Sequence, residues 1–308
     1  MDTTKPINTL IEDFLSEADC KPNSLDNYRR TLRIWVNWMV VNADIKEPTK
    51  AHLLMYRNHL SKHRETSTVD SYMSAVKLLF KYLAEKEIHP NVALGIRRLR
   101  KSTTHRRGNL SIDQVDELLS ALPRQTLIEK RNYAIINLMV RTGLRCVEVA
   151  TLNYKDLTVT MPVSELRFQR KGRHEKDALF TLTASIALPI IDYLRHRGDP
   201  NDDDPLFARC GQCAGQRIGT QTISHIIINA YNLIGIKDKR MTAHSLRHTA
   251  ARIAIGAGSD IYNVQQLLGH TNPATTMIYL RELELENKEA ASAIRILDKV
   301  YKTDQIHD

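Results

Sequence analysis

The 308-residue chain has few cysteines and no long apolar run, and each shortage excludes a class of protein. The four cysteines, Cys20, Cys146, Cys210 and Cys213, are too few for a disulfide scaffold and fit a reducing compartment. No segment approaches the roughly 18 consecutive apolar residues that a membrane helix needs. The first residues also lack the apolar core of a signal peptide. We therefore expect a cytoplasmic protein.

A metal-binding motif is missing as well. Cys210 and Cys213 have the spacing of half a zinc site, but no second Cys-x-x-Cys pair accompanies them. Because a structural zinc ion needs four ligands, we expect an ordinary loop at this place. The chain also contains no Walker motif and no convincing cluster of carboxylates.

Positive charge is concentrated in the first third of the chain. The formal net charge is +9, with a pI near 9.3. Residues 1–107 hold 19 Lys and Arg against 12 Asp and Glu, which gives +7, and the rest of the chain contributes only +2. A basic N-terminal part indicates a polyanionic partner, most commonly nucleic acid, although a solvated basic surface would look the same.

The N-terminal part is predicted to be a bundle of four amphipathic helices. Apolar residues recur there at every third or fourth position. The predicted segments are 6–17, 24–41, 49–60 and 67–87. Ser24 is the expected N-cap of the second helix. The aromatic stripe, which includes Trp35 and Phe80, is expected in the core and not as a platform for stacked bases.

Residues 97–108 are predicted to link this helical domain, over 1–96, to a second domain over 109–308. The segment has six basic residues, no acidic residue and no apolar periodicity. The basic residues are Arg97, Arg98, Arg100, Lys101, Arg106 and Arg107. A polycationic linker is suited to a phosphate backbone, and the alternative is an exposed hinge.

The second domain is predicted to be mainly helical with one β-hairpin. Ser111 opens its first helix with a capping box. Residues 166–170 and 178–182 alternate between apolar and polar, and the polar turn 171–175 separates them, which indicates a hairpin. Helices are predicted over 111–122, 129–142, 145–152, 184–196, 220–234, 242–257, 260–268, 272–281 and, in the tail, 284–302.

Two arginines lie in sequence surroundings that favour the binding of an anion. Thr242 is the expected N-cap of its helix, so His244 and Arg247 share one face near a helix N-terminus. Alone, such a pair more often lies on the surface. Gly143 ends the helix predicted over 129–142, and Arg145 follows it in an apolar turn, where burial of Arg145 is costly without an anionic partner. Glu148 either forms an internal salt bridge with Arg145 or orients it toward a phosphate.

Three more side chains give only weak evidence of function when each is considered alone. Lys171 lies in the predicted hairpin turn, where most lysines face only solvent, although a mobile ammonium there can reach a DNA groove. His270 follows the helix predicted over 260–268. Tyr279 comes nine positions after His270, where a lone tyrosine usually packs in a core with its hydroxyl at the surface.

Together these residues resemble the tyrosine recombinases of the phage-integrase and Xer-like family. The family pattern is matched by T-G-x-R-x-x-E over 142–148, the hairpin Lys171, H-x-x-R from His244 to Arg247, and L-G-H over 268–270 followed by Tyr279. The family hairpin often reads Gly-Lys-Gly, whereas here Arg170 precedes Lys171. The acting cation is therefore Lys171, Arg170 or Arg173.

The resemblance implies a two-domain clamp around duplex DNA, with a SAM-like helical core-binding domain over 1–96 and a catalytic domain over 109–308. Tyr279 would attack a phosphodiester and form a 3′-phosphotyrosyl link that conserves the bond energy for rejoining. The implied partners of Tyr279 are Arg145 and Arg247 as the phosphate clamp, His270 as a third donor, His244 as proton acceptor and Lys171 as general acid. No metal or other cofactor is required.

The resemblance also implies an assembly. The tail helix over 284–302 would dock on a neighbouring protomer and build a tetramer on two DNA sites, although it can also pack on its own domain. A type IB topoisomerase-like relaxase shares the chemistry but acts as a monomer without such a tail. A non-catalytic DNA-binding regulator would predict an incomplete catalytic set. Integration or excision of a mobile element, inversion and replicon resolution are all compatible with these motifs.

Overall fold

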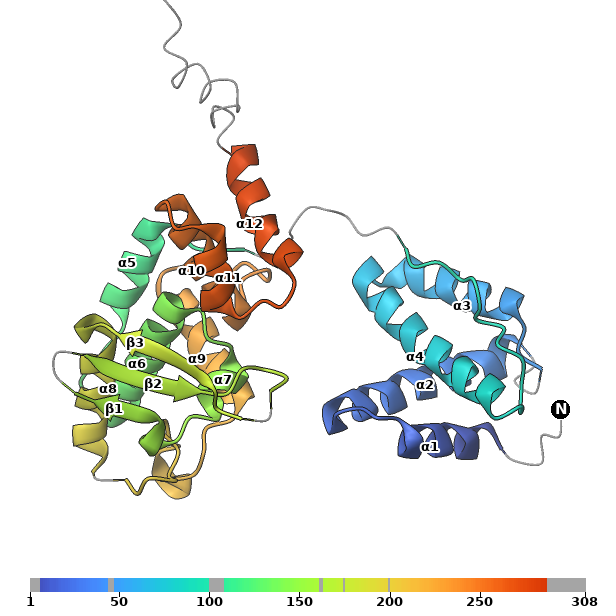
Figure 1. The fold of residues 1–308 in the computed structure, drawn as a ribbon, viewed down its shortest axis with the longest axis horizontal. Helices are drawn as coiled ribbons and strands as arrows, with labels where there is room; N and C mark the ends of the chain where they lie inside the picture. The colour runs from blue at the N-terminus through green and yellow to red at the C-terminus, as the bar shows by residue number, and fades with distance from the viewer. Residues whose placement is uncertain are drawn as a thin grey trace, which may run out of the picture. The chain divides into compact units, whose positions relative to one another are not determined.

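The computed structural model describes residues 6–43, 47–99, 108–160, 163–173, 175–198 and 200–286, and it describes side-chain surroundings as far as residue 280. The chain divides into two compact units, Met1–Thr104 and His105–Asp308 (Figure 1), and each is described by itself. Among the described residues, none of the helices combines the length and the apolar character needed to cross a membrane.

The first unit is a bundle of four helices around an aromatic core. They are α1 (Ile7–Glu17), α2 (Pro22–Asn42), α3 (Lys50–His63) and α4 (Thr66–Glu85). Trp35 and Phe80 are fully buried and meet edge to face, with ring centroids 5.6 Å apart. The predicted bundle and its aromatic core are confirmed. The predicted N-cap Ser24 is wrong: Lys21 is the N-cap, because Pro22 starts the helix with a preset φ and no N–H to leave unpaired.

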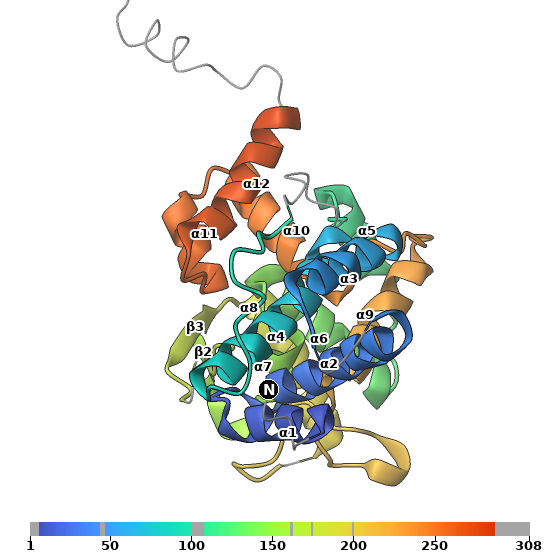
Figure 2. The ribbon, with the colours of Figure 1, turned by 90° about the vertical axis from the view of Figure 1, so that its right-hand side faces the viewer.

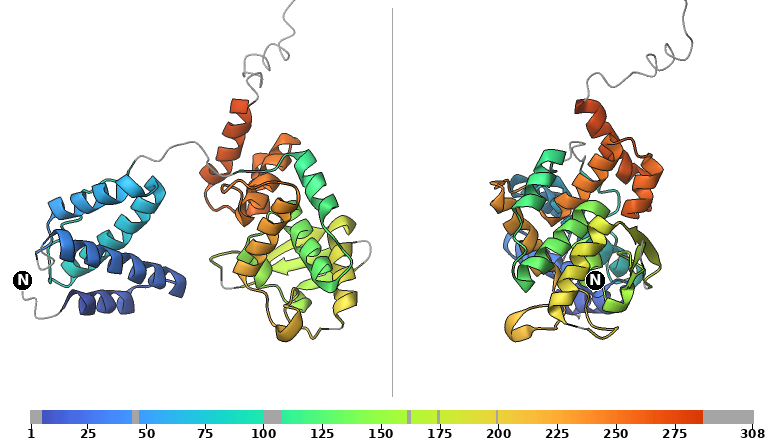
Figure 3. Two further views of the ribbon diagram at one scale, coloured as in Figure 1. Left: turned by 180° about the vertical axis from the view of Figure 1, so that it is seen from behind. Right: turned by 90° about the vertical axis from the view of Figure 1, so that its left-hand side faces the viewer.

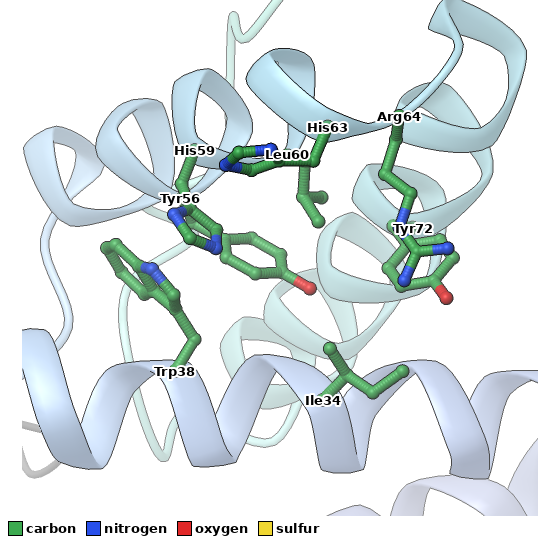
Figure 4. A pocket seen from close by; sticks show the side chains of 8 residues that line it. All are labelled: Ile34, Trp38, Tyr56, His59, Leu60, His63, Arg64 and Tyr72. Atoms are coloured by element: carbon green, nitrogen blue, oxygen red, sulfur yellow. The ribbon is translucent and has the colours of Figure 1, made fainter.

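A pocket of about 300 Å³ opens between α2, α3 and α4 (Figure 4). It is lined by Ile34, Trp38, Tyr56, His59, Leu60, His63, Arg64 and Tyr72. Tyr56 is fully buried, and its hydroxyl has no hydrogen-bond partner among the described residues. Burial raises the pKa of this phenol. Aromatic side chains of the bundle therefore surround a cavity on this side and do not form a flat surface.

The second unit is built around α6. Its helices are α5 (Ile112–Ala121), α6 (Leu127–Thr142), α7 (Cys146–Ala150), α8 (Ala184–Arg197), α9 (Thr220–Leu233), α10 (Ala243–Gly256), α11 (Ile261–Leu268) and α12 (Pro273–Glu286). Residues 134–136 and Leu138 of α6 are fully buried, and α8 and α10 pack against this helix. The predicted capping box is confirmed, since Ser111 Oγ accepts from the Gln114 N–H at 3.2 Å.

A small antiparallel sheet lies against the helices of this unit. Its strands β1 (Leu157–Val159), β2 (Ser164–Phe168) and β3 (Ala178–Leu182) are ordered β1-β2-β3. Leu166 of β2 is fully buried and pairs with Phe180 of β3. The predicted hairpin is confirmed. Strand β1 was not predicted, because three residues are too short to show an alternating pattern.

Helices α10, α11 and α12 form a cluster of their own beside this core (Figure 2; Figure 3, both views). Their contact is filled by the buried side chains of Ala251, Val264, Leu268 and Tyr279. Helix α12 runs without a break from Pro273 to Glu286, so the predicted end near residue 281 is wrong. No glycine or proline interrupts the helix after Pro273. The rest of the predicted tail helix, 287–302, lies outside the described residues.

Candidate catalytic site

Gly143 creates the turn that presents the first arginine. It ends α6 in the left-handed conformation, with φ of 67°. A Cβ atom added there would lie 2.8 Å from Cδ2 of Leu268, so the buried leucine side chain would have to shift. Two residues later Arg145 becomes the N-cap of α7.

The carboxylate of Glu148 holds Arg145 and the hairpin turn together. Its side chain is completely buried, whereas that of Arg145 is 23% exposed. One carboxylate oxygen accepts from Arg145 Nη1 at 2.8 Å and from the Lys171 backbone N–H at 3.1 Å. The other accepts from the Arg145 backbone N–H at 2.8 Å. The salt bridge expected as the plain alternative is present, and it fixes the guanidinium in place.

Arg247 is the buried partner of Arg145. The residue is 1% exposed, and its Nη1 donates to the carbonyl of Gly143 at 2.8 Å. Its Nη2 donates to the carbonyl of Leu268. Burial, with a further contribution from the charge of Arg145, lowers the pKa of Arg247 to about 10, so the group stays charged at neutral pH. Its Nε is buried and has no hydrogen-bond partner among the described residues.

The two arginines share one cleft with Lys171 and His244. The cleft has a volume of about 460 Å³ and is lined by Leu144, Arg145, Cys146, Val147, Lys171, Thr220, Ala243, His244 and Arg247. The predicted N-cap Thr242 is confirmed, so His244 and Arg247 lie in the first turns of α10. Because the guanidinium charges repel each other, an anion bound between them would be strongly stabilised.

Arg170 ties the hairpin to the end of α11. Its Nη1 and Nη2 donate to the carbonyls of Leu267 and Gln266 at 3.0 and 2.8 Å. Its guanidinium also stacks on the ring of Phe168, 4.8 Å from the centroid. Gly269 permits this approach, because a Cβ atom there would lie 2.7 Å from the guanidinium. Burial lowers the pKa of Arg170.

Of the three candidate hairpin cations, Lys171 is the one that lines the cleft. Arg170 is occupied by the carbonyls at the end of α11, and Arg173 forms an ion pair with Asp177 at 3.3 Å. The local geometry therefore favours Lys171 as the cation that meets a bound phosphate.

His270 lies close to the same positive charges. Its Nδ1 is 2.8 Å from Oγ1 of Thr276. Burial, together with the charges of Arg247, Arg145 and Arg170, lowers the pKa of His270 to about 4. The imidazole is therefore neutral at pH 7, where it can still donate one N–H to an anion.

Tyr279 is buried, and its hydroxyl is hydrogen-bonded to a histidine. Tyr279 is 3% exposed, and its oxygen lies 2.6 Å from Nδ1 of His248, which is 6% exposed. The negative form of this phenol is close enough to raise the pKa of Arg247. The resemblance implies His244 as proton acceptor, whereas the described hydrogen bond is made to His248.

His248 is a candidate that the motifs did not single out. Its ring meets that of His244 edge to face, with centroids 4.6 Å apart. The sequence signal for His248 is its position four residues after His244, because residues four positions apart lie on the same face of a helix. His248 thus joins the cleft-lining His244 to the phenol of Tyr279.

The remaining candidates are not among the described residues that line the cleft. Arg97 and Arg98 are exposed in the first unit. Arg100, Lys101, Arg106 and Arg107 lie outside the described residues. Cys210 and Cys213 are free thiols at a short 3-10 turn, and Cys210 Sγ lies 3.5 Å from Nη1 of Arg131.

Comparison with known proteins identifies the family. Residues 109–286 match the Phage integrase family. This chain belongs to the phage integrase family of tyrosine recombinases. Residues 9–90 match the family's N-terminal SAM-like domain.

Curated relatives match nearly the whole recombinase. The chain is 29% identical to tyrosine recombinase XerD of Vibrio cholerae over 285 residues, which are 89% of this chain and 92% of the relative. It is 26% identical to XerD of Listeria monocytogenes over 306 residues, with shares of 92% and 97%.

Solved structures share the fold at lower identity. XerH bound to palindromic difH substrate has a TM-score of 0.73 at 21% identity, covering 92% of this chain and 84% of that one. A lambda integrase dimer bound to a COC′ core site has a TM-score of 0.69 at 15% identity, with coverages of 87% and 96%.

Proposed function

We propose that this recombinase cuts and rejoins duplex DNA at specific sites through a 3′-phosphotyrosyl intermediate on Tyr279. The observation that carries the proposal is the cleft, in which Arg145, Arg247, Lys171 and His244 converge although they come from distant parts of the sequence. The buried Nε of Arg247, without a partner among the described residues, supports an anionic ligand.

The cleft supplies what a phosphodiester needs during transesterification. Arg145 and Arg247 donate to the non-bridging oxygens, on which charge builds up in the transition state. The flat guanidinium makes paired hydrogen bonds that a lysine cannot reproduce. Lys171 protonates the departing 5′ oxygen, and neutral His270 adds one N–H donor. Because Tyr279 is buried in the described state, the segments that cover its hydroxyl must open before DNA reaches it.

The proposed partners are duplex DNA and further copies of the chain. XerH was solved bound to difH, and lambda integrase was solved as a dimer on a core site, which supports a multimeric complex on DNA. The finer proposal is a tetramer on two DNA sites in which the segment 284–302 docks on the next protomer. Residues 97–107 are proposed to follow the phosphate backbone. The proposed compartment is the cytoplasm, since four free cysteines fit a reducing environment.

Integration or excision of a mobile element and replicon resolution are the proposed biological roles. The two differ in where the recombined site lies. Sequencing the DNA on both sides of the coding region supplies candidate sites and separates element ends from a chromosomal resolution site.

A nicked suicide substrate tests the chemistry. Duplexes made from these candidate sites lose a short 5′-hydroxyl fragment after cleavage, so rejoining fails and the protein stays attached to DNA. We expect a covalent adduct that resists denaturing detergent. Tyr279→Phe should abolish the adduct and keep DNA binding.

The matched control is Tyr262→Phe, because Tyr262 is a 62% exposed tyrosine on α11. Its adduct should form at the normal rate. An undiminished adduct in Tyr279→Phe would contradict the assignment, and a chain that binds DNA but never forms an adduct would be a regulator.

A further inference from the structure

We propose that His248 is a catalytic residue that takes the phenolic proton of Tyr279. This inference rests on the proposed function, because it assigns the base for the nucleophile of that reaction. A free phenol has a pKa near 10 and needs a proton acceptor, or strong electrostatic help, to attack at neutral pH. The reaction therefore requires a base close to the Tyr279 hydroxyl.

The contact between the two side chains has the required geometry. The Tyr279 oxygen and His248 Nδ1 are 2.6 Å apart, within the range for direct proton transfer. Both residues are more than nine-tenths buried, so bulk water competes little for the hydrogen bond. With the imidazole neutral and its proton on Nε2, Nδ1 accepts from the phenol.

The other histidines of the site are less suited to this step. His270 has its Nδ1 engaged with Thr276. His244 lines the cleft and contacts His248 through its ring, so it faces the bound phosphate. His248 is the histidine with a described hydrogen bond to the hydroxyl.

The proton balance closes without an added reagent. The phenolic O–H bond breaks, and its proton forms an N–H bond at His248 Nδ1. The phenolate oxygen forms a bond to phosphorus, the bond from phosphorus to the 5′ oxygen breaks, and that oxygen takes a proton from Lys171. Rejoining reverses each transfer, so His248 returns its proton to the leaving phenolate. The positive charge of Arg247, close to the phenol, stabilises the phenolate.

His248→Asn tests the proposal with little change of shape. The Asn amide group lies near the place of Nδ1, so it can still accept a hydrogen bond, but it does not take up a proton. We expect single-turnover cleavage of the suicide substrate to fall about 100-fold. DNA affinity and the thermal midpoint should stay near wild type. His248→Phe, which lacks every polar ring atom, should fall at least as far.

The acidity of the phenol at position 279 distinguishes a role of His248 as a base from a role in packing alone. Ring-fluorinated tyrosine at position 279 has a more acidic phenol and depends less on a base. It should restore cleavage by about tenfold in His248→Asn and give a much smaller gain in the wild type. A bridging 5′-sulfur substrate, whose thiolate leaves without protonation, should rescue Lys171→Ala but leave His248→Asn slow.

The outcomes distinguish a failure of the proposed function from a failure of the role assigned to His248. His196→Gln removes a histidine from α8, away from the cleft, and should cleave at the wild-type rate. If the wild type forms no adduct, the proposed function itself fails. If the wild type forms one and His248→Asn cleaves equally fast, His248 is not the base. A slow variant that fluorotyrosine does not help would assign His248 to packing alone.

Discussion

Replacement of Glu148 by glutamine should weaken both the fold and the chemistry. The carboxylate accepts three hydrogen bonds, two from Arg145 and one from the Lys171 backbone. A glutamine of the same shape has one acceptor oxygen and one NH₂ donor. In its better orientation the oxygen keeps Arg145 Nη1 and the Lys171 N–H. The NH₂ then meets the Arg145 backbone N–H, donor against donor.

The magnitude follows from that clash and from the lost charge. A buried donor left without its charged acceptor costs about 1.5–3 kcal/mol. Arg145 is 23% exposed, so water replaces part of the lost ion pair. We expect the free energy of unfolding to fall by about 2–3 kcal/mol. Because Arg145 would be held less firmly against the phosphate, cleavage should slow about 100-fold.

Two measurements and one control check this reasoning. Urea unfolding gives the stability, and single-turnover cleavage of the nicked substrate gives the rate. Glu129→Gln is the matched control, because Glu129 accepts two backbone N–H bonds at the start of α6 and does not line the cleft. That control should lose stability but keep its cleavage rate. Wild-type stability together with a wild-type rate in Glu148→Gln would refute the role of the carboxylate.

Three further predictions concern the clamp, the protonation of His270 and the basic segment. Arg247→Lys loses the fork that reaches the Gly143 and Leu268 carbonyls, so cleavage should fall about 100- to 1,000-fold with DNA still bound; a near-normal rate would remove Arg247 from the clamp. His270 has a folded-state pKa of about 4 against about 6.5 when unfolded. Its contribution to stability should therefore be complete above pH 6.5 and decline toward pH 4, and urea unfolding of His270→Gln across that range should show a flatter pH dependence; identical curves would contradict the shift. Changing Arg97 and Arg98 together to Gln should lower the slope of log affinity against log salt by up to about 2, and an unchanged slope would exclude phosphate contacts by these residues.

Local patterns in the sequence predicted most of the architecture. Helical spacing placed the four-helix bundle, and alternation placed the hairpin, because both signals arise between neighbouring residues. The glycine that ends α6 and the N-caps Ser111 and Thr242 were also readable. Strand β1 was missed because its pairing with β2 gives a three-residue segment little pattern of its own.

The site was predictable as a set of residue types but not as a set of contacts. The motifs selected Arg145, Lys171, His244 and Arg247, and the structure brings these four to one cleft. The second role of Glu148, as acceptor for the Lys171 N–H, depends on a contact across 23 residues. The partner of Tyr279 was missed because two helices must pack before His248 meets the hydroxyl. Tertiary contacts of this kind produce no regular spacing of residues from which the sequence would reveal them.

The attachment of Arg170 to the carbonyls of Gln266 and Leu267 has a mechanical consequence. The hairpin turn carries the proposed acid, and the loop that starts at Gly269 leads into the helix of the proposed nucleophile. A displacement of the turn by a DNA groove would pull on that loop through two hydrogen bonds. Engagement of the substrate at one end of the site would thereby act on the other end, which would couple the arrival of DNA to the exposure of the proposed attacking group.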